Sequence, residues 1–271
     1  MVHEHPAAHT ASRQRLHRWL SCPSGKALLD TERKLLDGVL PHLFGHYILQ
    51  VGRLGDADLL ARSRIPHRVV VEVDTNRNVP GYPRLRAEPH ALPVASDSVD
   101  VVVLPHLLEF SPHMQETIQE AERILVAEGH LLILAFNAWS LVGIRCLLCR
   151  RAPHVDRHSD SCLPCPGARF PGINPIKNRI AVLGFDIISI DRYFFQPPAV
   201  SPALTDRLRF LDVMGPRFWP LLSGAYFIVA KKRVTTLTPI KRRRQQPRRL
   251  LIAAGLGESS SCRPASERRP R

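Results

Sequence analysis

The chain has 271 residues, of which 44% are apolar, and it carries a formal net charge of +14. This length and apolar content suffice for one sizeable folded domain with extensions, and they exclude global disorder. No stretch of the sequence reaches the roughly 18 apolar residues that span a bilayer. The first residues also lack the apolar core of a secretory signal, so we expect a cytoplasmic protein.

The N-terminal part is expected to be a short flexible segment followed by helices. Residues 1–15 are polar and show no apolar periodicity, which predicts a flexible N-terminus. Residues 16–44 place leucines near a 3.6-residue spacing, which predicts a helical extension. Pro23 and Gly25 interrupt this pattern, so two short helices are expected rather than one.

Strand-like and helical patterns then alternate along the chain. Strands are expected at 47–51, 68–73, 82–87, 99–104, 130–136, 185–195 and 225–233, and helices at 111–129 and 174–183. Apolar strands that alternate with helices favour a mostly parallel sheet covered on both faces. The predicted fold class is therefore a doubly wound α/β domain, whose last strand forms an antiparallel edge because no long helix precedes it.

The residues that follow the first two strands predict a ligand site, because ligands of open α/β sheets bind outside the carboxyl ends of the strands. Gly52 and Gly55 follow the first strand and allow a close backbone approach, although this spacing also suits an ordinary turn. Asp74 follows the second strand, 22 residues after Gly52. A carboxylate at this distance can accept hydrogen bonds from both ribose hydroxyls, while the sequence Asp-Thr-Asn equally suits a turn.

Two later loops carry further candidate residues. Glu88 lies in the polar segment 87–100, where a carboxylate or a neighbouring amide can meet the polar edge of an adenine. His106 and Glu109 follow the fourth strand and are titratable candidates for contact with a substrate. The alternative for both loops is a polar or packed connection between elements.

Taken together, these segments resemble the class I S-adenosylmethionine-dependent methyltransferases, and within them the type-11 group. Two motif blocks carry the likeness: Leu92, Pro93, Ser98, Asp100, Val102, His106, Leu108 and Glu109, and then Glu120, Arg123, Leu125, Gly129, Leu131 and Ile133. Uncharacterised proteobacterial stand-alone members share further residues: Trp19, Leu20, Pro23 and Gly25; Phe136, Asn137, Ser140, Gly143 and Arg145; and Val229, Ala230, Lys232, Arg233, Leu237, Thr238 and Pro239.

The resemblance implies a Rossmann-like methyltransferase fold with a seven-stranded sheet. Residues 16–236 would form the methyltransferase-like domain, with 16–44 as its helical extension and 46–137 as its cofactor-binding core. The implied cofactor is S-adenosyl-L-methionine. The implied reaction is direct displacement of its methyl group by an acceptor that the resemblance does not name, and no catalytic residue is assigned.

The resemblance also implies roles for the glycine turn. Gly52, with Gly55 completing the turn, would lie under the methionine and ribose part of the cofactor, and Gln50 would hydrogen-bond the amino end of the methionine. The family usually has an acidic residue in place of Gln50, and glycines in place of Leu54 and Asp56. These departures motivate an alternative function, a catalytically silent methyltransferase-like protein with a binding or regulatory role.

The remaining cofactor contacts are carried over in the same way. Asp74 would bind the ribose hydroxyls, and Glu88 with its neighbours would meet the adenine. Leu104 and His106 would flank the sulfonium.

Two features lie outside this resemblance. The first is a pair of C-x-x-C elements whose spacing suits a thiolate zinc site, although cysteines in a helical pattern also serve as small apolar residues: Cys146, Cys149, Cys162 and Cys165. The predicted cofactor site itself includes no metal. The second feature is residues 237–271, which hold ten Lys and Arg against two Glu and so carry +8 of the net charge. We expect a disordered basic tail, either simply solvated or in weak contact with nucleic acid, which would suit an RNA-associated methyltransferase.

Overall fold

The computed structural model describes residues 6–72, 83–140, 143–144, 170–195 and 223–233. Seven strands form one sheet: β1 (Tyr47–Val51), β2 (His67–Glu72), β3 (Arg84–Arg86), β4 (Val99–Pro105), β5 (Leu125–Phe136), β6 (Phe185–Tyr193) and β7 (Ala225–Lys232). Their order is β3-β2-β1-β4-β5-β7-β6. Neighbours from β3 to β5 pair in parallel, while β7 pairs antiparallel with both β5 and β6. The predicted doubly wound, mostly parallel sheet is confirmed, and the last strand is antiparallel as expected. It does not form the edge, however, because β7 lies between β5 and β6 and β6 is the edge strand.

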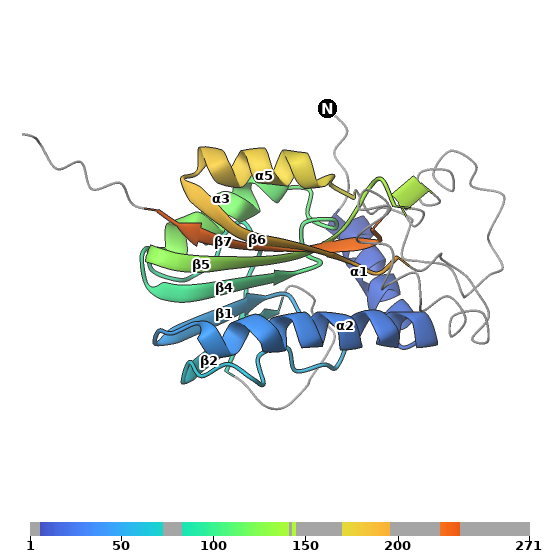
Figure 1. Ribbon diagram of the computed structural model, residues 1–271, viewed down its shortest axis with the longest axis horizontal. Coiled ribbons are helices and arrows are strands. Elements are labelled where there is room, and N and C mark those ends of the chain that lie inside the picture. The colour runs from blue at the N-terminus through green and yellow to red at the C-terminus, as the bar shows by residue number, and fades with distance from the viewer. Residues whose placement is uncertain (1–5, 73–82, 141–142, 145–169, 196–222, 234–271) are drawn as a thin grey trace, which may run out of the picture. The chain divides into compact units, whose positions relative to one another are not determined.

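Helices cover both faces of this sheet (Figure 1). They are α1 (Pro6–Leu20), α2 (Pro23–Val39) with a 3₁₀ turn at Leu40–His42, α3 (Met114–Ile124) and α5 (Ile173–Val182). One buried cluster joins α1 and α2 to alternate residues of β1, β4, β5 and β7, and a second joins α3 and α5 to the intervening residues of the same strands. This alternation follows from the period of two in a strand. Within the described residues, no helix is long and apolar enough to cross a membrane.

The N-terminal extension contains the two predicted helices, but the first is longer than expected. Helix α1 begins at Pro6, inside the segment that was expected to be flexible, because its C-terminal half packs into the core through residues such as Trp19. Pro23 stands at the start of α2, where its fixed φ suits a first turn. A β-carbon on Gly25 would lie 2.3 Å from the carbonyl oxygen of Trp19, so this glycine lets the two helices meet closely.

The boundary between α3 and β5 differs from the sequence-based expectation. Residues 111–129 were expected to be helical, yet α3 ends at Ile124 and β5 starts at Leu125, four residues before Gly129. Leu125 pairs with Val99 of β4, and the register shifts before the regular pairing that begins with Val101 and His130. The early pairing extends the strand through residues that a periodicity argument assigns to the end of the helix.

Candidate functional site

Strands β1, β2 and β4 end on the same side of the sheet, at Val51, Glu72 and Pro105. We call this side the carboxyl edge. In Figure 1, α1 lies beside this edge. Ligands of open α/β sheets bind at such an edge, near the point where the strand order reverses. That point falls between β1 and β4, since successive strands lie on opposite sides of β1.

The glycine turn, residues 52–55, leaves β1 at this position. Gly52 has a φ of +81° and Gly55 a φ of +59°, conformations that favour glycine. Gln50 is 2% exposed, and its side-chain amide donates a hydrogen bond to the carbonyl oxygen of Gly52 at 3.0 Å. Leu54, which stands where the family usually has a glycine, is fully buried in the core. The turn is thus shaped by its glycines and anchored by one apolar side chain.

Two residues of α1 contact the glycine turn, and the sequence did not single them out. Arg13 is 4% exposed and donates from its guanidinium to the carbonyl oxygen of Arg53 at 3.2 Å. A β-carbon on Gly52 would lie 2.8 Å from that guanidinium. The backbone N–H of Gly55 donates to Nδ1 of His17 at 3.0 Å, so His17 accepts there. Helix α1 is therefore part of the predicted cofactor site.

The structure describes the chain up to Glu72, the end of β2, and not the acidic position that follows it. Asp74, the predicted ribose ligand, lies outside the described residues. Glu72, the last residue of β2, places a carboxylate oxygen 4.0 Å from a guanidinium nitrogen of Arg53 in the glycine turn. This pair links the ends of β1 and β2, and sequence reasoning missed it because a contact between two strand ends has no local signature.

The predicted adenine loop is held by a pair of charged residues on α3. Glu120 accepts a hydrogen bond from the backbone N–H of Leu92 at 2.8 Å, and Arg123 donates to the carbonyl oxygens of Leu92 and Val94. The hydrogen bond from Arg123 lowers the pKa of the Glu120 carboxyl. Glu88 itself has a side chain that is 76% exposed and lies 3.1 Å from His90. The motif residues on α3 thus fix the loop, and Glu88 stands free of the core beside it.

The residues at the end of β4 and just after it were predicted to flank the cofactor. In the structure they are buried. Leu104 is 1% exposed, and His106 is fully buried with a φ of +44°. Both ring nitrogens of His106 have partners: Nδ1 lies 2.8 Å from Glu109 and Nε2 lies 2.6 Å from Glu32 of α2. The hydroxyl of Tyr193, at the end of β6, also donates to Glu32 at 2.9 Å.

These four residues form a buried unit that we call the acid–histidine cluster: Glu32, His106, Glu109 and Tyr193. Burial lowers the pKa of His106, but the charges of the two carboxylates outweigh it and raise the pKa from 6.5 to about 10. The ring is therefore an imidazolium at neutral pH. In this structure it joins α2 to the loop after β4.

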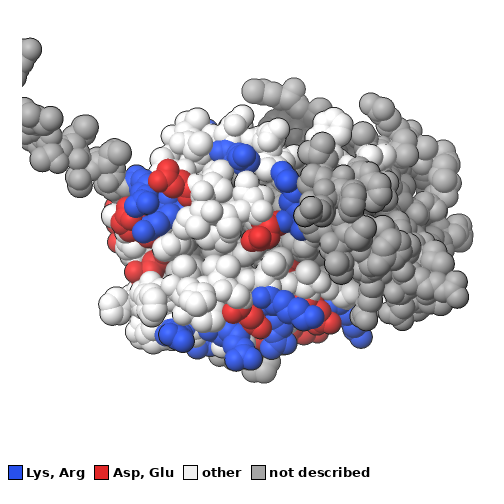
Figure 2. Space-filling model, viewed as in Figure 1, with Lys and Arg blue, Asp and Glu red and all other residues white. Residues whose placement is uncertain are grey.

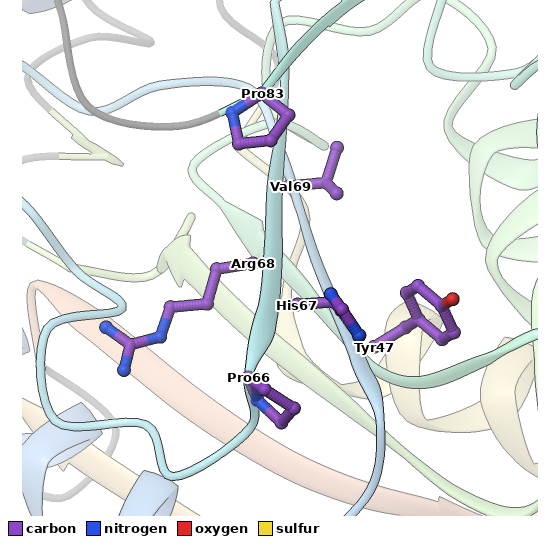
Figure 3. A pocket seen from close by; sticks show the side chains of 6 residues that line it. All are labelled: Tyr47, Pro66, His67, Arg68, Val69 and Pro83. Atoms are coloured by element: carbon purple, nitrogen blue, oxygen red, sulfur yellow. The ribbon is translucent and has the colours of Figure 1, made fainter.

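A separate hollow of about 360 Å³ opens on the opposite side of the sheet, where β1 and β2 begin (Figure 3). The rings of Tyr47 and His67 stack there with centroids 4.8 Å apart. The remaining lining residues are Pro66, Arg68, Val69 and Pro83. This hollow is remote from the predicted site residues. The four cysteines of the proposed zinc site lie outside the described residues.

Comparisons with known proteins bear on the fold and on part of the chain. Residues 59–133 match the family model described as a methyltransferase domain. The chain is 27% identical over 248 residues to the uncharacterized protein YafS of Escherichia coli (strain K12), covering 90% of this chain and 92% of that protein.

Two solved structures share the fold. A SAM-dependent methyltransferase of Thermotoga maritima matches with a TM-score of 0.57 at 14% identity, covering 84% of this chain and 99% of that one. Another, of Mesorhizobium loti, matches with a TM-score of 0.50 at 12% identity, covering 73% of this chain and 96% of that one. Residues 59–133 thus resemble a methyltransferase domain, and the chain shares the Rossmann-like fold of S-adenosylmethionine-dependent methyltransferases, a likeness that implies S-adenosylmethionine as the cofactor.

Proposed function

We propose that the chain transfers the methyl group of S-adenosylmethionine to an acceptor that is already nucleophilic, such as an amine or a thiolate, by direct displacement. The observation that carries this proposal is the position of the glycine turn at the carboxyl edge, beside the reversal of the strand order. S-adenosylmethionine supplies a methyl group bonded to a positively charged sulfur, which activates it for attack. The protein then contributes positioning and exclusion of water.

The turn fits the cofactor in one specific respect. Gly52 and Gly55 both have positive φ, so the backbone curves where the methionine part is expected to lie. A β-carbon at Gly52 would meet the Arg13 guanidinium and, at 3.3 Å, a methyl group of Leu107. Glycine at position 52 therefore lets Arg13 and Leu107 pack closely against the strand end, next to the place where the cofactor is expected.

We infer the class of acceptor from the state of His106. A hydroxyl or phenol acceptor needs a base to remove its proton, and His106 was the residue to test first for that role. Its two nitrogens are held by Glu32 and Glu109, and its ring has no exposed surface. A protonated and buried imidazole cannot accept a proton from an acceptor, so the acceptor we propose is one that needs no base from this residue.

Labelled-methyl transfer into a fractionated cell extract tests the proposal. We expect label from the cofactor to enter amine- or thiol-containing products, and we expect the Gly52→Val variant to transfer none. Gly38→Val is the matched control, because a β-carbon at Gly38 meets nothing within 4 Å. Label found only in hydroxyl or phenol groups would contradict the choice of acceptor.

A catalytically silent binding protein is the second candidate, and one observation favours it. The side chains of Arg13 and Gln50 both lie on the glycine turn, and Gln50 lacks the charge that the family usually has. Binding of the cofactor with no labelled product in any fraction would favour this function over methyl transfer.

Contact with RNA through the basic tail remains a separate proposal, because residues 237–271 lie outside the described residues. On the face shown in Figure 2, Lys and Arg lie beside Asp and Glu instead of forming one continuous basic field. Ion pairs between such residues include Lys231 with Glu128 and Arg233 with Asp186. We propose that any nucleic-acid contact of a cytoplasmic enzyme lies in the tail, which carries +8 of the net charge. RNA affinity that is unchanged after deletion of 237–271 would contradict this.

A further inference from the structure

The loop after β4 begins with a residue in a strained backbone conformation. His106, which directly follows the last residue of β4, has a φ of +44°, in the left-handed region that residues other than glycine rarely adopt. Such a conformation persists only where the surrounding contacts fix it, and it is found most often at functional sites. The contacts that hold His106 therefore bear on the function of this loop, which was predicted to flank the sulfonium of the cofactor.

His106 is fixed both through its backbone and through its ring. Its backbone N–H donates to the carbonyl oxygen of Leu134 in β5 at 2.8 Å. Its ring donates through Nδ1 to Glu109 at 2.8 Å and through Nε2 to Glu32 at 2.6 Å. Glu109 also accepts a hydrogen bond from the backbone N–H of Phe136, at the end of β5. Glu32 brings helix α2 into the same set of contacts, so one imidazolium ring joins α2 to the ends of β4 and β5.

Stability alone does not explain why the chain has these charges in its interior. The Oε2 atoms of Glu32 and Glu109 are buried and have no hydrogen-bond partner among the described residues. Two buried carboxylates around one imidazolium also leave an unbalanced negative charge. Apolar side chains of similar volume often stabilise a protein as well as a buried ionic group does. Buried polar atoms without a partner call for another explanation, and fixing the geometry of a strained loop supplies one.

We propose that Glu32 is a positioning residue for methyl transfer: through His106 it holds the loop after β4 in the conformation that flanks the transferring group. This inference rests on the proposed function. Glu32 acts through His106 and not by touching the cofactor or the acceptor. Its action requires that both ring nitrogens of His106 carry protons, because a neutral imidazole has one N–H and donates to one carboxylate at a time.

The charge of Glu32 controls this protonation state. Among the described residues, the titratable groups around His106 are Glu32 from α2, Glu109 from the loop itself, Tyr193 from β6 and Tyr226 from β7. Burial raises the pKa of both tyrosines well above its ordinary value, so they stay neutral. Burial lowers the pKa of His106, but the two carboxylates outweigh it and raise this pKa to about 10. Removing the charge of Glu32 therefore lowers the pKa of His106, and its ring loses a proton at a pH where the wild type keeps it.

Labelled-methyl transfer from S-adenosylmethionine into the active extract fraction tests this role between pH 6.5 and 9. The ratio of kcat for Glu32→Gln to kcat for the wild type, at saturating cofactor, cancels the titration of the acceptor itself. We expect this ratio to fall by about 10-fold or more as the pH rises, the scale of a small misplacement near the reacting atoms. The affinity for S-adenosylhomocysteine, measured by calorimetry, should change by less than about 3-fold, which is small on the scale of a tenfold change per 1.4 kcal/mol.

A second readout needs neither cofactor nor acceptor. Nitrogen NMR of the histidine rings in the free chain should show His106 losing its proton at a lower pH in Glu32→Gln than in the wild type. The signal of His106 is assigned by its absence in His106→Gln. This measurement follows the protonation state on which the positioning depends, whether or not methyl transfer takes place.

Three variants serve as controls. Glu32→Asp keeps the charge on a shorter side chain, so it should lower kcat by a factor that does not depend on pH. Asp30→Asn removes the same charge from an exposed position on α2 and should leave kcat unchanged. Ile180→Ala removes buried apolar contacts of α5, so it should lower the thermal unfolding midpoint while its kcat ratio stays constant with pH.

Four results would overturn the proposal. A ratio for Glu32→Gln that does not change with pH would show that Glu32 contributes only to stability. A loss of affinity for S-adenosylhomocysteine as large as the loss of kcat would place the effect at the cofactor site. Full wild-type kcat in Glu32→Asp would contradict the positioning role even if Glu32→Gln did not fold. These three results leave the proposed function intact, whereas a wild type that transfers label to no fraction would overturn the proposed function and this inference together.

Discussion

The loop before β4 and the carboxyl edge are two separate regions, and different kinds of contact stabilise them. The loop is fixed by hydrogen bonds to Glu120 and Arg123, a pair that we call the clamp. Both residues lie within residues 59–133, which match the methyltransferase model. The carboxyl edge is closed by Arg13, His17 and Glu32, all from helices before that match. Residues of the matched segment thus hold the loop before β4. Helices α1 and α2, which precede that segment, contact the carboxyl edge, where the cofactor is expected.

A second contrast concerns water. The clamp is partly exposed to solvent: the side chain of Arg123 is 37% exposed and that of Glu120 is 14% exposed. The acid–histidine cluster is sealed, since the side chains of His106 and Glu32 are fully buried. Solvent weakens charge interactions at the clamp and not in the cluster, so equivalent substitutions should have unequal effects in the two regions.

The largest effect is expected from His106→Gln. Removing the imidazolium leaves Glu32 and Glu109 facing each other in a buried site. Loss of one partner of a buried ion pair costs ~3–5 kcal/mol, so the free energy of unfolding should fall by about that amount. Urea unfolding followed by circular dichroism measures it, with His90→Gln at a partly exposed position as the control. A loss below ~1 kcal/mol, the value for an exposed pair, would show that the cluster is not sealed.

The same histidine predicts how stability depends on pH. Its pKa is raised from 6.5 to about 10 in the folded protein, so its stabilisation is fully present below pH 6.5 and is lost as the pH rises toward 10. The difference in unfolding free energy between wild type and His106→Gln should therefore shrink between pH 7 and 10. A difference that stays constant over this range would contradict the charged state assigned to His106.

A smaller effect is expected at the clamp. Arg123→Met removes hydrogen bonds to the carbonyl oxygens of Leu92 and Val94 and to Glu120. Because the guanidinium is partly solvated, the expected loss of unfolding free energy is ~1–2 kcal/mol. The matched control is Arg233→Met, which breaks exposed pairs and should change stability little. If Arg123→Met lowered the free energy of unfolding as much as His106→Gln does, the proposed difference between the partly exposed clamp and the buried cluster would be contradicted.

The smallest effect is expected from Tyr193→Phe. This change deletes one hydrogen bond to Glu32, whose oxygen still accepts from His106. The free energy of unfolding should fall by ~0.5–1.5 kcal/mol, the net value of a single hydrogen bond. Chemical denaturation detects this, and an unchanged midpoint would show that the hydroxyl adds nothing to the cluster.

Most of the fold is predictable from the sequence because its signals are local. The apolar run at 47–51 gives β1 without error, and the seven-stranded, mostly parallel sheet follows from the family resemblance. The early start of β5 at Leu125 was not predictable, because it depends on pairing with Val99 of another strand.

The site was predictable only in part. Gln50, Gly52 and Gly55 lie where the sequence placed them in the fold, at the end of β1. Arg13 comes from a polar segment without periodicity, and Glu32 is 74 positions from its partner His106. Contacts of this kind have no signature in a single sequence. Burial of His106 likewise follows from α2 lying over it, which residue spacing does not reveal.

Hydrogen exchange with and without S-adenosylhomocysteine tests the central claim, that the cofactor binds at the carboxyl edge against α1. We expect slower exchange in peptides covering the glycine turn and residues 13–20, and no change in peptides covering residues 42–47 and 66–69 beside the hollow of Figure 3. Protection beside that hollow instead, or no protection anywhere at saturating ligand, would contradict the account.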